Sequence, residues 1–314
     1  MDYLSPDEYR VSGEAHALWW GFGTLAFFIL FVTAFNVGLI ALGVAALAGI
    51  WVWVRQGQLI GASVRVSKDQ FPTIHTIARQ AAKRLGMPMP EMFVEYSPVL
   101  NAYALGFLGK KSVVLHSATI EAMDELELTF IIGHEFSHIK CGHTNLAVLT
   151  NSSDGLGIPI ISQALRFIFL FWQRKAEYTC DRGGLLANRN PRTAISAMCK
   201  LAVGPTLFKQ MNVERFLRQQ MDVEHSDVSK LSETLATHPY LVKRIQAMRD
   251  FFFSPEYDQI VSRIDQQSVP NTPKPESENI VVCCPKCSQK LRVPAHKKLE
   301  VRCSRCNHLF TATT

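Results

Sequence analysis

The clearest pattern along the chain is a long apolar stretch close to the N-terminus. Residues 17–54 contain no Asp, Glu, Lys or Arg, whereas residues 1–16 are polar and include four acidic residues. A single helix of this length would span roughly 57 Å, but the hydrocarbon core of a bilayer is only about 30 Å thick. We therefore predict two membrane spans, about 17–35 and 37–54, with one tilted helix and a partly buried extension as the alternative.

The charges beside this stretch predict its orientation. Arg55, Arg65 and Lys68 follow the second predicted span directly, and the tip between the spans carries no charge. The positive-inside bias places the open end, and everything after it, in the cytoplasm. The acidic start does not resemble the basic start of a signal peptide. We therefore expect a multi-pass membrane protein with a cytoplasmic domain.

The next segments alternate between helical and strand-like periods. Residues 67–86 have a helical apolar stripe, with Ser67 or Asp69 as the expected cap and Gly86 as the expected end. Short strand-like runs follow at 92–96 and 112–116. The segment 101–106 between them is typical of a further strand or an extended edge.

A strong helix is predicted for residues 124–142, where Asp124 and Glu127 form a capping box. The apolar segment 156–172 either touches or enters the membrane, or is a buried helix packed on the 124–142 helix. A separate helix is expected from Arg174 to Asn188, and the next one starts at Asn190 and Pro191.

The 124–142 helix contains the sequence His134-Glu135-Phe136-Ser137-His138, an HExxH motif. Positions i and i+4 of a helix are only ~40° apart, so both imidazoles can reach one Zn²⁺. Glu135 lies on the neighbouring flank, where it can face a metal-held water without ligating the metal. A match to so short a motif arises by chance in roughly one chain in a hundred of this length, so supporting residues are needed.

Catalytic zinc requires one more protein ligand. A third histidine at the metzincin spacing is absent, because Thr144 occupies that position, and His143 is expected to point elsewhere. Glu177 is the candidate on a later helix. Asp181, one turn further on, can accept the free ring N–H of a ligating histidine. The alternative is that Glu177 and Asp181 form a solvated helix face.

Four motifs in order give the chain a specific resemblance over residues 68–250. They are Asn101–Gly106, the HExxH followed by Gly142 and His143, Glu177 and Asp181 in an ExxxD spacing, and Thr237-His238-Pro239 with Arg244. This set resembles the gluzincin membrane peptidases, which include HtpX-type heat-shock proteases, CaaX-prenyl endopeptidases and Oma-type mitochondrial proteases. In contrast to the HtpX pattern, only one short apolar segment separates the HExxH helix from Glu177.

The resemblance implies an α+β, mainly helical peptidase domain with a small sheet, over residues 61–265. It implies catalytic Zn²⁺ held by His134, His138 and Glu177, with Glu135 as general base. Asn101, Ala102 and Tyr103 would form the edge strand that binds an extended substrate. His238 would donate to the oxyanion, unless it serves as a helix N-cap before Pro239.

The implied function is a membrane-anchored zinc metalloendopeptidase that hydrolyses polypeptides, including membrane proteins, in membrane protein quality control. The alternative is a membrane-tethered binding protein with a degenerate HExxH scaffold. The intact Glu135 argues against that alternative, because a scaffold needs no base there. The natural substrate, the cleavage specificity and the oligomeric state do not follow from these patterns.

The C-terminus carries a second metal signature. Cys284, Cys287, Cys303 and Cys306 have the spacing of a Cys₄ zinc ribbon over residues 281–314, and residues 266–280 form a polar, proline-rich linker. We expect a structural Zn²⁺ there, because so short a segment cannot fold on an apolar core. Its basic residues are compatible with protein, nucleic acid or acidic lipid as partner. The predicted domains are therefore the tail and transmembrane hairpin (1–60), the peptidase domain, the linker and the ribbon.

Overall fold

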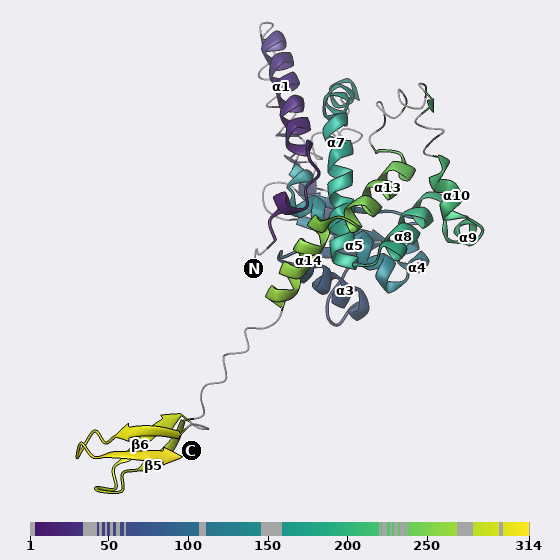
Figure 1. Ribbon diagram of the computed structural model, residues 1–314. Helices are drawn as coiled ribbons and strands as arrows, with labels where there is room; N and C mark the ends of the chain where they lie inside the picture. Colours follow the sequence, from purple (N-terminus) through teal and green to yellow (C-terminus); the bar gives the residue numbers. More distant parts are fainter. Residues whose placement is uncertain are drawn as a thin grey trace. The chain divides into compact units, whose positions relative to one another are not determined.

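The computed structural model describes residues 4–33, 61–106, 111–145, 159–219, 238–268, 279–294 and 298–313, with only scattered residues between 43 and 59 and between 221 and 236 (Figure 1). The chain divides into two units, Met1–Asp265 and Gln266–Thr314. Helices dominate the first unit, and the second consists of strands.

A four-stranded sheet forms one side of the first unit. Its strands are β1 (Val64–Arg65), β2 (Glu91–Glu95), β3 (Ala102–Gly106) and β4 (Lys111–His116), in the order β1-β2-β4-β3. The β2–β4 pair is parallel and the other two pairs are antiparallel. The three predicted strand-like runs are confirmed, and β3 lies at the edge of the sheet.

The two faces of this sheet follow the period of two that strands impose on their side chains. Met92, Val113 and Leu115 pack into the main core beneath the helices. Phe93 and Val114 alternate with them and pack on the other face, in a separate cluster that also includes Leu59 and Leu105. Both faces of the central strands are therefore covered.

Helix α5 (Glu125–Lys140) is the central helix of the core. Asp124 accepts a hydrogen bond from the backbone N–H of Glu127, whose side chain accepts from the backbone N–H of Asp124, so the predicted capping box is confirmed. Helix α3 (Pro72–Arg84) packs against α5. The predicted N-terminal cap, Ser67 or Asp69, is wrong: α3 begins at Pro72, after Phe71 in the left-handed region at φ 60°. The predicted end is confirmed, because Gly86 follows the C-cap Leu85 with φ 61°. Proline sets the dihedral angle of a first helical residue and needs no hydrogen-bond partner there.

Helix α7 runs without a break from Pro159 to Asn188. The predicted separation into a segment at 156–172 and a later helix is wrong, because no glycine or proline interrupts the chain around Gln173. The upper part of α7 lies beside α1 (Glu14–Thr33), as Figure 1 shows. Gly21 of α1 allows this approach, since a Cβ there would lie 2.5 Å from the ring of Phe169.

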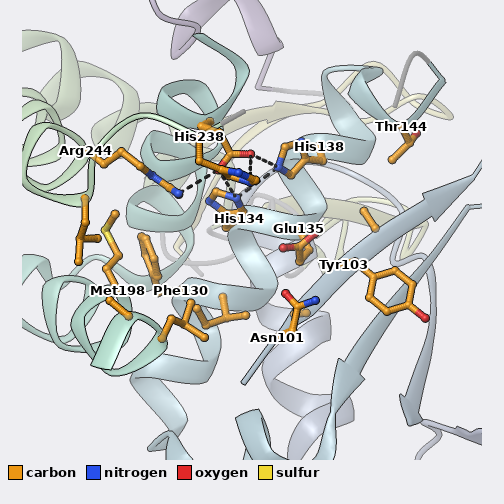
Figure 2. Close-up of a pocket in the computed structure, with 17 residues that line it drawn as sticks. Asn101, Tyr103, Phe130, His134, Glu135, His138, Thr144, Met198, His238 and Arg244 are labelled. Atoms are coloured by element: carbon orange, nitrogen blue, oxygen red, sulfur yellow. Dashed lines mark hydrogen bonds and ion pairs between the residues drawn. The ribbon is translucent and has the colours of Figure 1, made fainter. Parts of the chain in front are cut away.

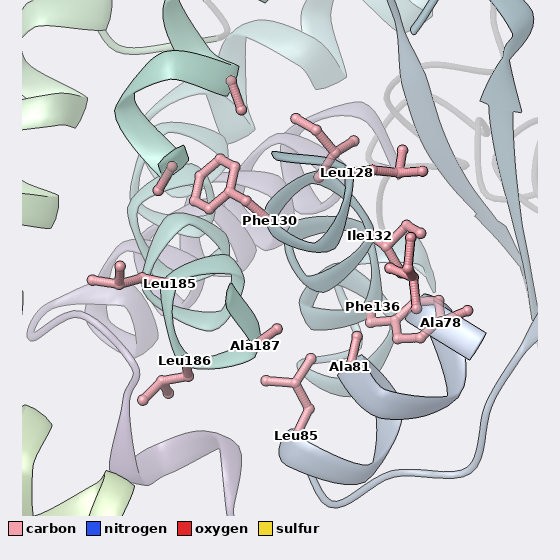
Figure 3. Packing of buried hydrophobic residues seen from close by; sticks show 14 of the residues in the cluster. Ala78, Ala81, Leu85, Leu128, Phe130, Ile132, Phe136, Leu185, Leu186 and Ala187 are labelled. Atoms are coloured by element: carbon pink, nitrogen blue, oxygen red, sulfur yellow. The ribbon is translucent and has the colours of Figure 1, made fainter. Parts of the chain in front are cut away.

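Helices α5 and α7 cross closely because small residues line their contact. A Cβ added at Gly184 would lie 2.9 Å from Phe130, and one added at Gly133 would collide with Ala187. Figure 3 shows α3, α5 and α7 around the shared core. The side chains labelled there are all buried: Ala78, Ala81, Leu85, Leu128, Phe130, Ile132, Phe136, Leu185, Leu186 and Ala187. This crossing fixes how near the middle of α7 comes to α5.

The other helices of the described residues surround this core. They are η1 (Pro6–Glu8), α4 (Ser117–Ala122), α8 (Pro191–Val203), α9 (Pro205–Phe208), α10 (Val213–Leu217), α13 (Leu241–Phe252) and α14 (Pro255–Ser268). Asn190 caps α8 as predicted. Two residues before the first predicted span, Leu4 and Tyr9, are buried in the same core as α5.

Among the described residues, α1 is the one helix long and apolar enough to cross a membrane, with Glu14–Phe31 as the apolar window. It covers most of the first predicted span. The second predicted span, 37–54, lies largely outside the described residues. Of the predicted linker, 266–268 continue α14 and 269–278 lie outside the described residues.

The second unit consists of two antiparallel hairpins. The first pairs β5 (Asn279–Cys283) with β6 (Lys290–Pro294), and the second pairs β7 (Lys298–Arg302) with β8 (Leu309–Thr313). Each CxxC pair lies in the turn of one hairpin. The residue after each pair, Ser288 or Asn307, has a positive φ of 57° or 61°.

Candidate active site

Two helices bring three potential metal ligands together. The Nε2 atoms of His134 and His138 are 3.2 Å apart, and they lie 3.7 and 3.5 Å from the two carboxylate oxygens of Glu177. Ligands at zinc-to-nitrogen or zinc-to-oxygen distances of ~2.0–2.1 Å in a tetrahedron would be about 3.4 Å apart. The three side chains therefore fit a tetrahedral metal ion with one position left open (Figure 2).

A buried ionic network holds this set from the side of α7 and α13. The Nδ1 atom of His134 lies 3.1 Å from Oδ1 of Asp181, so its N–H can donate there and leave the Nε2 lone pair for a metal. Arg244 of α13 donates to both oxygens of Asp181, at 2.8 and 2.6 Å. The same guanidinium lies 3.0 Å from Glu177. One arginine therefore orients both carboxylates.

The charge state of Glu177 suits a metal ligand. Burial on its own raises the pKa of this carboxyl, but Arg244 and the nearby histidines outweigh burial and hold the pKa well below its ordinary value. The pKa of Asp181 is likewise lowered, because Arg244 outweighs the opposite effect of burial. Both groups are therefore ionised at neutral pH and can hold a cation or an imidazole N–H.

The three ligands form part of the wall of a cavity of about 540 Å³. Its other walls come from β3, α8 and the start of α13. Figure 2 shows Glu135 on α5 beside His134 and His138, on the flank towards β3 and Asn101. The side chain of Glu135 is buried but lines the cavity. It is thus placed next to the open metal position without belonging to the three-ligand set.

Strand β3 and the residue before it form one wall of the cavity. Asn101, Ala102 and Tyr103 all contribute to this wall. The Tyr103 hydroxyl donates to Glu95 at 2.9 Å, and its ring packs edge-on against His116. Tyr103 therefore ties β3 to β2 and β4 within the sheet, at a position that also lines the cavity.

His238 lies at the mouth of the cavity and not at a helix cap. Helix α13 starts at Leu241 with Tyr240 at the N-cap position, so the capping alternative is wrong. The Nε2 atom of His238 lies 3.6 Å from Oε1 of Glu177, and 64% of the side chain is exposed. An exposed imidazole at this place can reach a bound substrate.

The sequence patterns did not reveal a second polar cluster behind His138. His143 does not join the three-ligand set: its Nδ1 atom lies 3.3 Å from Nδ1 of His138, at the opposite side of that ring. Its Nε2 atom lies 2.9 Å from a carboxylate oxygen of Glu14, the first residue of α1. No spacing could have indicated this contact, since Glu14 precedes a predicted membrane span.

The second unit contains its own candidate metal centre. The Sγ atoms of Cys284 and Cys306 are 3.7 Å apart, and those of Cys287 and Cys303 are 3.5 Å apart. Four thiolates at ~2.3 Å from a tetrahedral zinc would be about 3.8 Å apart. The cluster is therefore compatible with a zinc ribbon.

Comparison with known proteins agrees with this geometry. The sequence model of peptidase family M48 matches residues 68–155 and 156–251. The chain is 32% identical over 246 residues to the chloroplastic plastoglobule-localized metallopeptidase 48 of Arabidopsis thaliana. The aligned region covers 74% of this chain and 72% of that protein. It is 24% identical over 269 residues to a protease HtpX homolog of Tropheryma whipplei, covering 73% of this chain and 90% of the relative. A protease HtpX homolog of Bacteroides fragilis is 24% identical over 257 residues, covering 65% and 79%.

Proposed function

The chain belongs to peptidase family M48 and is a metallopeptidase, and we propose that it is a membrane-anchored zinc endopeptidase whose general base is Glu135. The observation that carries the proposal is the set of three ligand atoms, His134 Nε2, His138 Nε2 and the Glu177 carboxylate, in the wall of a cavity. A second-helix glutamate beside an HExxH pair matches the chemistry of catalytic zinc.

In this proposal His134, His138 and Glu177 hold the metal, and Asp181 orients His134. When bound, Zn²⁺ supplies a Lewis acid that makes a water nucleophilic and polarises the scissile carbonyl. Glu135 takes a proton from the attacking water and passes it to the leaving amine. His238 donates a hydrogen bond to the oxygen of the scissile carbonyl as negative charge develops on it.

We propose that the substrate is an extended polypeptide that pairs with β3. Among the described strands β3 pairs with β4 alone, and its residues Ala102, Tyr103 and Ala104 line the cavity. A peptide added there would place a backbone carbonyl near Glu135, and backbone hydrogen bonds would supply affinity with little dependence on side chains. Asn101, Ala102 and Tyr103 are the proposed binding segment.

The position of α1 supports action close to a membrane. Glu14, its first residue, contacts His143 behind the metal site, and the highly exposed Trp19 and Trp20 follow about 8 Å further along the helix. Tryptophan at such a level is typical of a membrane interface. We propose that the peptidase domain lies at the cytoplasmic surface on a multi-pass anchor, and that its substrates include membrane proteins under quality control.

A reporter protein fused after residue 265 tests this orientation. We expect a reporter that is active only in the cytoplasm to give a signal at this position, because Arg55, Arg65 and Lys68 follow the second predicted span. A periplasmic or lumenal signal would contradict the proposed topology without affecting the proposed chemistry.

We further propose that residues 281–314 hold a second, structural zinc. The ribbon would recruit protein or nucleic acid through its basic residues, and the segment between α14 and β5 would link it to the peptidase domain. The thiolate cluster supports the metal, and the composition of the segment supports the recruiting role.

Cleavage of an unstructured quenched peptide by the detergent-purified chain tests the proposed reaction. We expect cleavage that a chelator abolishes and added zinc restores. The variant Glu135→Gln is expected to lower kcat by roughly 10²- to 10⁴-fold while it keeps the catalytic-site zinc, because this residue acts as base and not as ligand. Full activity of Glu135→Gln would overturn the mechanism. A zinc-loaded parent chain that cleaves nothing would favour the binding-scaffold alternative.

A further inference from the structure

A cluster of polar side chains lies against the Nδ1 side of His138, opposite the nitrogen that faces Glu177. Its central members are Glu14 and His143, and both side chains are almost completely buried, at 2% and 3% exposure. None of them takes part in the proposed reaction. Buried polar groups are costly unless they are paired, so this arrangement calls for an explanation.

Glu14 is held by contacts from three separate segments. One of its oxygens lies 2.9 Å from Nε2 of His143 and 3.1 Å from the guanidinium Nε of Arg10. Its other oxygen accepts a hydrogen bond from the hydroxyl of Thr179 on α7. Thr179 lies two residues after Glu177 and two residues before Asp181, so α1 is attached to the same part of α7 that supplies a proposed metal ligand.

The contacts of His143 determine which of its nitrogens carries the proton. A carboxylate can only accept, so the proton of neutral His143 lies on Nε2 and points at Glu14. Its Nδ1 atom is then an acceptor, 3.3 Å from Nδ1 of His138 and 3.4 Å from the thiol of Cys180. His138 can then donate to this acceptor from its own Nδ1, which keeps its Nε2 lone pair free.

We propose that Glu14 and His143 are positioning residues of the metal centre, and that they select the tautomer of His138 that can ligate zinc. The chain Glu14–His143–His138 on one side thus corresponds to the Asp181–His134 pair on the other. The inference rests on the proposed zinc site. It means that Glu14, the first residue of α1, helps to support that site.

A different occupant of this cluster can be weighed on the same atoms. His138, His143 and Cys180 each offer one ligand atom within 4.8 Å of the others, and the three side chains would suit a second metal ion. The mutual contact of the two histidines is made by their Nδ1 atoms. That ion would need both nitrogens of His138 as lone-pair donors, which requires an imidazolate. The hydrogen-bonded chain needs only a neutral His138 ring, so the contacts favour it.

Metal affinity of the full-length chain in detergent tests the proposal. Zinc content is measured against increasing concentrations of a competing chelator, and Co²⁺ spectra separate the sites, because thiolate ligands give charge-transfer bands that a His₂Glu site lacks. We expect Glu14→Gln to weaken the catalytic-site metal by roughly 10- to 100-fold, and the ribbon metal to stay unchanged. The control is Asp7→Asn, which removes the same charge from the same segment at a 77% exposed side chain that also pairs with Arg10.

His143→Gln provides the second arm, from the other end of the contact. It is expected to lower the affinity for the same metal site by a similar factor. The double variant should bind this metal no more weakly than the weaker-binding single variant, because both residues act through one chain of contacts. Melting temperatures of the metal-free variants separate an effect on folding from one on binding.

Three outcomes would overturn the inference. Glu14→Gln could bind the metal as tightly as the parent chain, Asp7→Asn could lose as much metal affinity as Glu14→Gln, or the losses of affinity could add in the double variant. A further metal ion that Glu14→Gln retains and Cys180→Ala loses would also overturn it. If the parent chain and Glu177→Ala hold the same amount of metal, the proposed zinc site itself is wrong. That result differs from each of the outcomes above, which test only the roles of Glu14 and His143.

Discussion

The His134–His138–Glu177 centre and the Cys₄ centre of the ribbon differ in how far along the chain their parts are spread. All four thiols of the ribbon lie between Cys284 and Cys306, in the turns of two adjacent hairpins. The support of the other centre extends from Glu14 on α1 to Arg244 on α13.

This difference has a physical origin in what each centre must do. Each ribbon turn has a positive φ just after its CxxC pair, at Ser288 or Asn307, and the proposed zinc would supply the stability. A catalytic metal must keep an open position beside a base and a substrate strand, so its ligands need rigid support from elsewhere. The close crossing of α5 and α7 at Gly133 and Gly184 provides that support.

The largest expected effect is that of removing the ligand on α7. Glu177→Ala should lose the catalytic-site metal and all peptide cleavage, because two histidines alone hold zinc weakly. Metal analysis and the quenched-peptide assay measure both losses. Glu125→Ala, an exposed glutamate in the first turn of α5, serves as the control and should change neither. Retention of the catalytic-site metal in Glu177→Ala would mean that the third ligand is wrong.

A smaller effect is expected at the cavity mouth, where His238→Phe keeps a ring but loses the hydrogen-bond donor. If His238 stabilises the oxyanion, kcat should fall by roughly 10²- to 10³-fold, with little change in KM or in metal content. Steady-state kinetics on the quenched peptide separate the two parameters. A change confined to KM would instead place His238 in substrate binding.

A third variant tests the ionic support of His134. Asp181→Asn can turn its amide N–H towards Nδ1 of His134, which favours the tautomer that cannot ligate, and it weakens the pairing with Arg244. We expect the affinity for the catalytic-site metal to fall by roughly 10- to 100-fold, with activity partly restored by excess zinc. Chelator competition measures this, and Asp258→Asn on the exposed face of α14 is the control. An unchanged affinity for the metal would mean that Asp181 serves only to bind Arg244 and so to hold α13 in place.

The smallest effect on peptide cleavage is expected from loss of the ribbon. Truncation at Gln266 should reduce the metal content from about two zinc per chain to about one, because four thiolates leave with the segment. Cleavage of an unstructured peptide should stay within about twofold of the parent, since every proposed catalytic residue precedes residue 266. One zinc per chain before and after truncation would refute the ribbon. Loss of cleavage would show that the ribbon completes the active site.

Several features of the first unit could be predicted because their cause is local. The capping box of Asp124 and Glu127, the Asn190 cap and the three strands at 91–116 depend on neighbouring residues, and the structure confirms them. The HExxH motif lies on one helix, so its two imidazoles were certain to share a face. Membership of the metallopeptidase family also followed from motifs read in order along the chain.

Other features depend on contacts between distant residues, and only the tertiary structure decided them. The continuity of α7 and its crossing with α5 bring Glu177 to within 3.5–3.7 Å of the two histidines, a distance that no spacing encodes. Arg244 reaches both carboxylates through the packing of α13 on α7. Glu14 reaches His143 across the chain because Tyr9 and Leu4 are buried in the same core as α5. Sequence patterns therefore determined which groups are present, and the packing of helices determined which of them meet, because side-chain contacts between elements depend on how their surfaces fit together.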